Sequence, residues 1–208
     1  MALSTGIETL DRKLSGGLPA GTLVAVITPP GVQHDPLLCA GTDERASHFY
    51  TTMKSEAAVR RSFERSTGGS KIEYIEQIDP AEADNQFAAR IHDIGEGEDF
   101  YVDTIDPIEE SLDRDSYADL LNSFDDKLAE IDSIGYLYGL ATETPPHNRR
   151  YTLDFADCVL RLRARQQRDK LNYYLEIPKA TGVALGGKDR YLEIDIDRGV
   201  DIDQTRNI

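Results

Sequence analysis

The sequence predicts an α/β fold, an open and mostly parallel sheet flanked by helices, with an antiparallel β extension at the carboxyl end. Up to about residue 156, short apolar, β-branched segments alternate with amphipathic segments of helical period, which is typical of a parallel sheet with helical crossovers. Beyond it, alternating polar and apolar residues lie between tight turns, which favours antiparallel strands. The 208 residues suit one domain with a single core. We divide that domain into an α/β core, 1–156, and a β-rich extension, 157–208.

The expected elements follow in chain order. Ser4 and Thr5 are predicted to cap a short helix that runs to Leu14, and Gly16-Gly17 end it. An apolar strand at 22–27 leads through a proline- and glycine-bearing turn into a helix at 36–40, which Gly41 is expected to stop. The later core elements are strands at 48–52, 71–78, 100–105 and 134–141 and helices at 55–65, 79–92, 115–131 and 151–155. The extension is predicted to hold an antiparallel meander of strands at 158–165, 172–177, 190–195 and 199–202.

The charge balance bears on partners. The formal charge is −15 with a sequence pI of about 4.6, and the carboxylates are dispersed along the chain. A dispersed acidic surface with more Arg than Lys fits a protein hydrated in concentrated salt, as in a halophilic archaeon, and an acidic mesophilic protein is the alternative. In both cases the net field repels nucleic acid, so no direct nucleic-acid partner is expected.

Other composition features place the chain in the cytoplasm. No run of about 18 apolar residues exists, so no membrane span is expected. The amino-terminal segment carries acids and lacks the apolar centre of a signal peptide. Cys39 and Cys158 lie in apolar contexts and are expected to be reduced and buried. The four histidines form no cluster with cysteine, so a structural zinc site is not supported.

The stretch 22–35, TLVAVITPPGVQHD, is the centre of the predicted site. A buried strand, a loop and a helix start together form the arrangement with which proteins hold phosphate, because backbone N–H groups and the helix N-terminus face the anion. The residues of this stretch therefore decide whether a phosphate can bind.

The order LSTGIETLDRKLSGGLPAGTLVAVITPPG resembles the lead-in to the phosphate loop of the KaiC/RadA-like branch of RecA-fold ATPases. Further matches follow in order, at the acid-ended strand 100–103, the segment 156–162 and the sequence YLEIPK at 174–179 followed by Gly182. The resemblance covers nearly the whole chain. It implies a RecA-like fold, ATP and Mg²⁺ as the ligands of the family, and edge-to-edge assembly into filaments or rings.

The loop itself departs from the family pattern G-x-x-x-x-G-K-[ST]. Thr28 and Gln33 replace the two glycines, while His34 replaces the lysine and Asp35 the hydroxyl residue. Gly31 and the two prolines before it keep the appearance of the loop. The resemblance thus implies a degenerate nucleotide site made of Pro30, Gly31, Val32, Gln33, His34, Asp35 and Asp103.

The changed residues also favour a helix start that supplies its own anion. Asp35 is predicted to cap the next helix, with Pro36 at its first position. A capping carboxylate uses the N–H groups that a phosphate needs. At about 4 Å and an effective dielectric constant of about 20, it also repels one phosphate charge by roughly 4 kcal/mol.

Two further functional elements of the family are changed. Met53 and Lys54 stand where the resemblance implies the acid pair that activates water, and neither is a base at neutral pH. The basic K-x-R pair that reaches a neighbouring subunit's nucleotide becomes Lys179-Ala180-Thr181. Asp103 keeps the position of the Mg²⁺-side acid. We therefore expect no catalytic residues and no bound cofactor, although the family binds ATP and Mg²⁺.

Two other uses of these residues stay open. His34, Asp35 and Asp103 could together ligate a divalent metal, or be a solvated histidine and a helix cap. Lys179, which remains of the K-x-R pair, and the pair Arg149-Arg150 are candidate interface residues. The arginine pair could bind a partner's carboxylate, or serve only local charge balance.

The leading hypothesis is a catalytically inactive RecA/KaiC-like protein that regulates or scaffolds an active ATPase or signalling complex. Its partner is then another protein, such as a RecA-family ATPase, or a second copy through self-association. The alternatives are a nucleotide-binding KaiC/RadA-like ATPase with an atypical loop and an accessory factor in DNA recombination or repair.

Overall fold

A computed structural model describes residues 1–208 except for 33–34, 66–71, 168–169, 187–189 and 195–208. The predicted strand at 199–202 lies outside the described residues.

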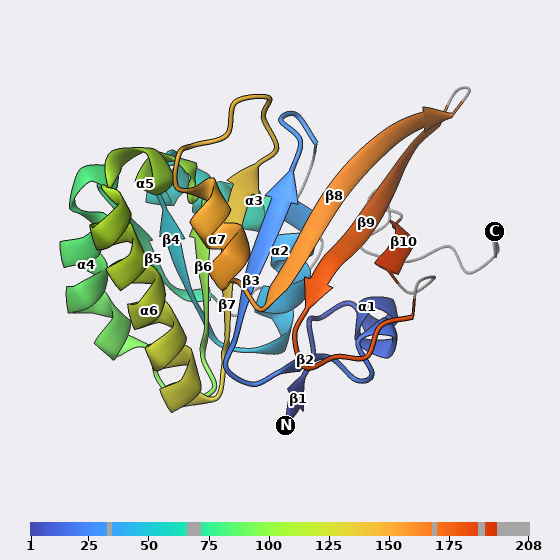
Figure 1. The fold of residues 1–208 in the computed structure, drawn as a ribbon, viewed down its shortest axis with the longest axis horizontal. Coiled ribbons are helices and arrows are strands. Elements are labelled where there is room, and N and C mark those ends of the chain that lie inside the picture. Colours follow the sequence, from blue (N-terminus) through green and yellow to red (C-terminus); the bar gives the residue numbers. More distant parts are fainter. Residues whose placement is uncertain (33–34, 66–71, 168–169, 187–189, 195–208) are drawn as a thin grey trace.

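An eight-stranded sheet forms the centre of the fold (Figure 1). Its strands lie side by side in the order β10 (Tyr191–Ile194), β9 (Lys170–Ala180), β8 (Cys158–Gln167), β3 (Thr22–Thr28), β7 (Ile134–Leu140), β6 (Asp99–Asp103), β4 (Ser47–Thr51) and β5 (Ile72–Gln77). Neighbouring strands from β8 to β5 are parallel, and β9 and β10 add antiparallel pairs at one edge. The predicted fold class is confirmed. A small antiparallel ladder joins β1 (Ala2–Leu3) to β2 (Leu18–Pro19).

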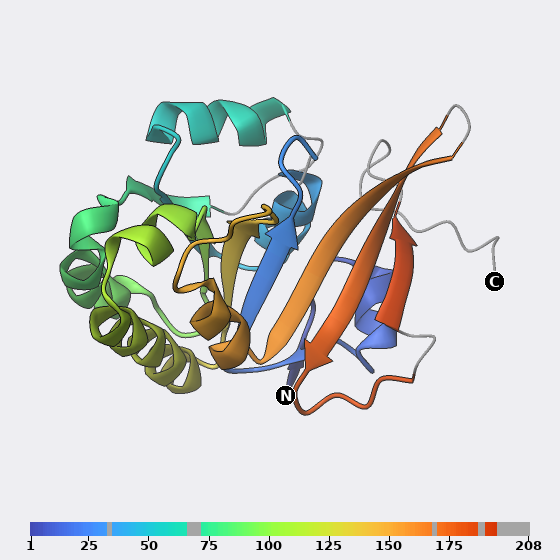
Figure 2. The same cartoon turned by 45° about the horizontal axis from the view of Figure 1, so that its top comes forward.

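Helices cover both faces of the parallel part of the sheet. The helical elements are α1 (Glu8–Lys13), α2 (Asp35–Glu44), α3 (Glu56–Arg65), α4 (Ala83–Arg90), α5 (Asp106–Ser111), α6 (Arg114–Ile131) and α7 (Arg149–Phe155), with 3₁₀ turns η1 (Pro80–Glu82) and η2 (Ile91–Asp93) beside α4. Side chains of α1, α2 and α3 pack in the core cluster of one face. Those of α4, α5 and α6 pack in the cluster of the other, where α7 also lies. Figure 2 shows the long β8–β9 hairpin extending beyond these helices.

The helix after the central loop is longer than predicted. Gly41 was expected to stop it, yet α2 continues to Glu44. A Cβ added at Gly41 would lie 2.4 Å from the Tyr101 hydroxyl, so glycine is present here because a helix and a strand approach closely. A glycine in a helical pattern often marks the end of the helix, but here it marks a packing contact.

One helix, α5, was not predicted, and the predicted cap of α1 is wrong. Helix α5 follows β6 directly, and its carboxylate Asp106 accepts the Leu140 N–H across the sheet edge. The side chains of Ser4 and Thr5 do not cap α1. Instead, both hydroxyls donate to the carboxylate of Asp11 within α1 at 2.7 Å, which ties the segment before the helix to the helix itself.

Helix α6 supplies a test of local stabilisation. The exposed Asp113 caps it and accepts the N–H groups of Asp115 and Ser116, which lowers the pKa of its carboxyl, first through Ser116 and then Asp115. A lowered folded-state pKa gives stability that is present above the ordinary value of 3.8 and is lost as the pH falls through the folded-state value. We expect Asp113→Ala to lower the urea midpoint at pH 7, and the difference from wild type to narrow as the pH falls below that ordinary value. Asp119→Ala on the same helix is the control, and an unchanged gap at acid pH would contradict the cap.

Candidate functional site

The candidate site lies along the carboxyl edge of the parallel strands. In open α/β sheets this edge is where ligands bind. β3 ends at Thr28 and leads into the loop before α2, while β6 ends at Asp103 and β4 at Thr51. Because β7 lies between β3 and β6, the loop and Asp103 are separated by two strand spacings, about 10 Å. The fold therefore brings the predicted phosphate loop and the predicted metal-side acid to one edge.

The described part of the loop offers few hydrogen-bond donors. Pro29 and Pro30 have no N–H, and the Val32 N–H donates to the Pro29 carbonyl at 3.2 Å. This closes a turn in which Gly31 has φ +80°, a conformation that favours glycine after proline. Within residues 29–32, only the Gly31 N–H is left for a ligand, whereas a phosphate loop surrounds its anion with several.

The rest of the predicted loop is only partly described. α2 begins at Asp35, within one residue of the predicted start. Gln33 and His34 lie outside the described residues, as do the side chains of Asp35 and Pro36. The predicted capping contact and the predicted metal site of His34, Asp35 and Asp103 therefore stay predictions. Within the described residues, no group of three or more His, Cys, Asp or Glu could hold a metal ion.

The acid that keeps its position is already paired with a cation of the same chain. Lys54 Nζ lies 3.2 Å from Asp103 Oδ2, and the Asp103 side chain is 2% exposed. The turn after β4 fixes this geometry, because the Thr51 hydroxyl donates to the Lys54 carbonyl and accepts the Lys54 N–H. Met53, the other residue where the family resemblance implies an acid, is exposed to solvent. An ammonium thus lies against the carboxylate to which the family resemblance assigns Mg²⁺.

Of the three candidate interface residues, Arg149 is the one that the structure buries. It is 5% exposed and binds inside the chain at the start of α7. Its guanidinium donates to Glu109 at 2.8 Å, to Asp106 at 2.8 Å and to the Leu140 carbonyl at 2.9 Å. Thr152 also donates to Glu109, and it shares a hydrogen bond with the buried Tyr117 hydroxyl. These contacts lock α5, α7 and the end of β7 together.

The other two predicted interface residues stay closer to the surface. Arg150 is exposed, and its guanidinium lies over the Tyr151 ring, 4.6 Å from the centroid. Lys179 on β9 is half-buried and donates to the Asp154 carbonyl in the last turn of α7 at 2.6 Å. A role of Arg150 and Lys179 at an interface stays a prediction.

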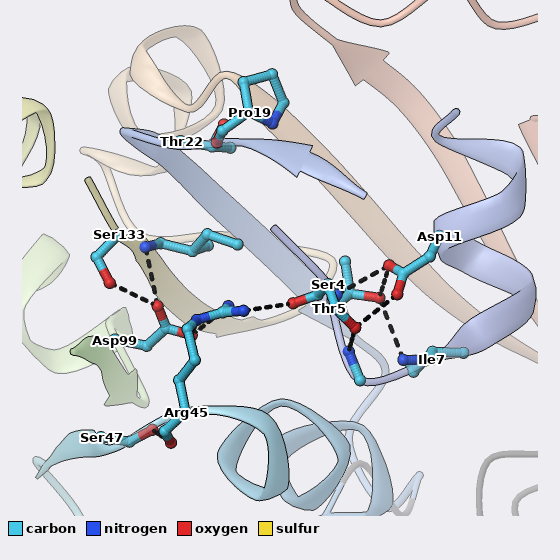
Figure 3. A network of polar contacts seen from close by, with 12 residues as sticks. Ser4, Thr5, Ile7, Asp11, Pro19, Thr22, Arg45, Ser47, Asp99 and Ser133 are labelled. Atoms are coloured by element: carbon cyan, nitrogen blue, oxygen red, sulfur yellow. Dashed lines mark hydrogen bonds and ion pairs between the residues drawn. The ribbon is translucent and has the colours of Figure 1, made fainter. Parts of the chain in front are cut away.

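The lead-in that resembles an ATPase family serves the fold directly (Figure 3). The Ser4 carbonyl accepts a hydrogen bond from Arg45, whose guanidinium also donates to the buried Asp99 at the start of β6. Asp99 in turn accepts from the Ser133 hydroxyl and the Ile134 N–H at the start of β7. The resemblance is therefore carried in part by residues that tie the amino-terminal segment to the sheet.

A cavity beside the site was missed by sequence reasoning. It has a volume of about 290 Å³ and lies between the end of β3, the loop after β7, α7 and β8. Arg161 and Arg163 of β8 line one side. The alternation LRLRAR within the predicted strand could have placed these arginines on one face, but the sequence contains no signal for a cavity.

The remaining predicted features can be placed briefly. Cys158 is free and buried, and burial raises the pKa of its thiol to about 12, with a smaller effect from Asp157, so it is not a reactive thiolate. The side chain of Cys39 is outside the described residues. None of the described helices is long and apolar enough to cross a bilayer.

Comparison with known proteins identifies a family and a fold. The chain belongs to a family of unknown function, DUF7125, whose model matches residues 2–208. No curated protein matches it. Among solved structures it is similar to the flagellar accessory protein FlaH from Methanocaldococcus jannaschii, with a TM-score of 0.70 and 14% identity over 93% of this chain and 94% of that one. At this identity the likeness shows the fold, which is RecA-like.

Proposed function

We propose that this chain is a catalytically inactive, KaiC/RadA-like member of the RecA-like fold that acts by binding another protein, as a regulator or scaffold of an active ATPase or signalling complex. The observation that carries the proposal is the ion pair of Lys54 with Asp103. It places a side-chain amine of the chain against the carboxylate to which the family resemblance assigns Mg²⁺.

The electrostatics of the edge support loss of nucleotide chemistry. Mg²⁺ binds through carboxylates and phosphate oxygens together. With Lys54 Nζ at 3.2 Å, the Asp103 charge is already balanced, and a metal ion would meet a like charge beside it. The turn at 29–32 adds only one unused N–H for phosphate oxygens. No base stands at Met53 or Lys54 to activate water.

The chain keeps the fold although the residues for ATP hydrolysis are changed, and a role in binding other proteins is consistent with that combination. The sheet is continuous and the lead-in network is formed, so the chain keeps a well-packed body whose outer surfaces can serve assembly. The solved structure that it resembles is named an accessory protein, and an accessory role is what we propose for this chain. The partner is a RecA-family ATPase or a second copy of the chain.

The direct test is calorimetric titration with Mg-ATP and with Mg-ADP in molar KCl. We expect no saturable heat at micromolar to millimolar nucleotide, because residues 29–32 leave only one N–H for phosphate and the Asp103 carboxylate is already paired with Lys54. An active KaiC/RadA-like ATPase titrated in the same buffer serves as the positive control. Micromolar binding with turnover would overturn the proposal.

One observation favours the alternative, a nucleotide-binding protein with an atypical loop. Lys54 is 42% exposed at the same edge, so its ammonium is accessible to a phosphate as well as to Asp103. In that case Asp103→Ala is expected to abolish the binding of Mg-ATP, and Lys54→Met is expected to weaken it. A role as an accessory factor in recombination is separated from a signalling role by the partner, which affinity purification at native salt identifies.

A further inference from the structure

One face of β8 carries three arginines in a row. Cys158, Leu160 and Leu162 point into the core, so the alternate residues Arg161, Arg163 and Arg165 lie on the opposite face. This is the face on which α7 lies near the start of the strand. Further along, within the described residues, no helix covers it, and β8 and β9 extend beyond the helical layer (Figures 1 and 2).

The arginine row is only partly neutralised by the chain. Arg163 donates to Glu176 at 2.8 Å, and Arg165 lies over the Tyr174 ring at 5.8 Å. Arg161 makes no hydrogen bond or ion pair with the described residues. The pKa of Glu176 is lowered mainly by its hydrogen bond with Arg163, and the charge of Arg161 lowers it by a smaller amount.

Register extends the same face across the neighbouring strands. Lys179 of β9 is opposite Val159, and Glu193 of β10 is opposite Tyr174. Among the side chains that the structure describes, Arg161, Arg163, Arg165 and Lys179 thus share the face with two carboxylates, Glu176 and Glu193, although the chain as a whole carries −15. A local basic surface on an acidic chain has its complement in an acidic ligand.

The cavity of about 290 Å³ adjoins the first two arginines of the row. Ile27, which pairs with Arg161 in register, contributes apolar surface together with Leu140 and Leu153. The rest of the lining is mainly proline and alanine, with the polar side chains of Thr142 and Arg149 beside them. Pockets for small molecules span about 300–1,000 Å³, so this one is at the lower limit and suits a side chain. An apolar side chain fits here, next to guanidinium groups that bind carboxylates.

We propose that the arginine row and this cavity together bind an acidic, extended segment of a partner protein. One apolar side chain of the segment fills the cavity, and carboxylates at alternate positions meet the arginines. The spacing agrees, because alternate residues repeat every 6.6–6.8 Å or so in both β8 and an extended segment. Arginine is suited to this contact because its planar fork binds carboxylate oxygens in pairs. The inference rests on the proposed function, for which it names the docking surface and the chemistry of the partner.

A synthetic peptide tests the surface directly. The probe is a fluorescent peptide with one leucine followed by glutamates at alternate positions, and a peptide with glutamines in their place is its control. We expect saturable binding of the acidic peptide in fluorescence anisotropy, and about tenfold or greater weakening by Arg161→Gln. Arg60→Gln, an equal charge change on the exposed side of α3, should bind as wild type does. Matching unfolding curves of both variants would show that the fold is kept.

Three results would overturn the inference: no saturable binding of the acidic peptide, equal binding by Arg161→Gln, or tighter binding of a single-stranded oligonucleotide than of the peptide. Affinity purification distinguishes an error in the docking surface from an error in the proposed function. If Arg161→Glu with Arg163→Glu captures the same partner in the same yield as wild type, the surface is wrong and the proposed function stands. If wild type turns over Mg-ATP, the proposed function fails whatever the peptide shows.

Discussion

Replacing Arg149 by methionine is expected to lower the free energy of unfolding by about 3–5 kcal/mol. The variant keeps the length and apolar stem of the side chain and removes the guanidinium. Glu109, which is 0% exposed, then loses its counter-ion at 2.7 Å, and Asp106 loses the same partner. A buried carboxylate left without its cation carries the full penalty of desolvation. Urea unfolding with linear extrapolation at fixed salt measures the loss.

The pH dependence of the same variant gives a second readout. Burial raises the pKa of Glu109 above its ordinary 4.5, against the opposing effects of Arg149 and Thr152. Without Arg149 the pKa rises further, so the folded variant binds a proton that the unfolded chain releases. Its stability is then highest below the ordinary pKa and falls as the pH rises through the folded-state value. We therefore expect the deficit against wild type to grow from acid to neutral pH.

Two further variants show whether the pair is the cause. Arg150→Met changes the adjacent, exposed arginine and should shift stability by less than about 0.5 kcal/mol. Glu109→Gln in the Arg149→Met background removes the orphaned charge and should recover part of the loss. Equal stability of the Arg149 and Arg150 variants would contradict a buried network at this site.

The parts of the fold that could be predicted are those encoded in local patterns. The apolar run at 22–27 and the helical period at 115–131 each specify an element without help from the rest of the chain, and β3 and α6 match them within one residue. The pair Asp106-Pro107 is a sequence signal for a helix start, but the helix α5 that begins there is only six residues long. Its carboxylate binds Leu140, a contact that no local pattern contains.

The errors come from contacts between residues far apart in the chain. Gly41 has the local signature of a helix stop, yet it lies inside α2. The reason is its close contact with the hydroxyl of Tyr101, which comes from strand β6. Arg149 was grouped with Arg150 because they are adjacent, although its partner Glu109 lies 40 residues earlier. The sequence showed that Lys54 is not a catalytic base. That it pairs with Asp103, 49 residues later, needed the strand order β6–β4.

Replacing Asp99 by asparagine is expected to cost about 3–5 kcal/mol of stability, comparable with the Arg149 variant. Asp99 is fully buried, and its two carboxylate oxygens accept four hydrogen bonds, two from Arg45 and one each from the Ser133 hydroxyl and the Ile134 N–H. The asparagine amide has the same shape, but its NH₂ group must face donors, either those of Arg45 or those of Ser133 and Ile134. The substitution also leaves the Arg45 guanidinium without a counter-ion. Urea unfolding measures the loss. Ser133→Ala, which removes one neutral donor, should cost only about 1 kcal/mol.

The position of this network predicts where the damage spreads. Arg45 also donates to the Ser4 carbonyl at 2.9 Å, so the ion pair with Asp99 holds the guanidinium that anchors the lead-in to the sheet (Figure 3). In Asp99→Asn we expect faster hydrogen exchange at the Thr5 N–H, which donates to Asp11, while the amides of β3 keep their protection until global unfolding. Loss of protection in both segments together would mean that the lead-in unfolds only with the whole domain. Unchanged exchange at Thr5 would mean that Asp11 alone holds it. Only separate exchange of the two segments shows that Asp99, through Arg45, holds the lead-in against the sheet.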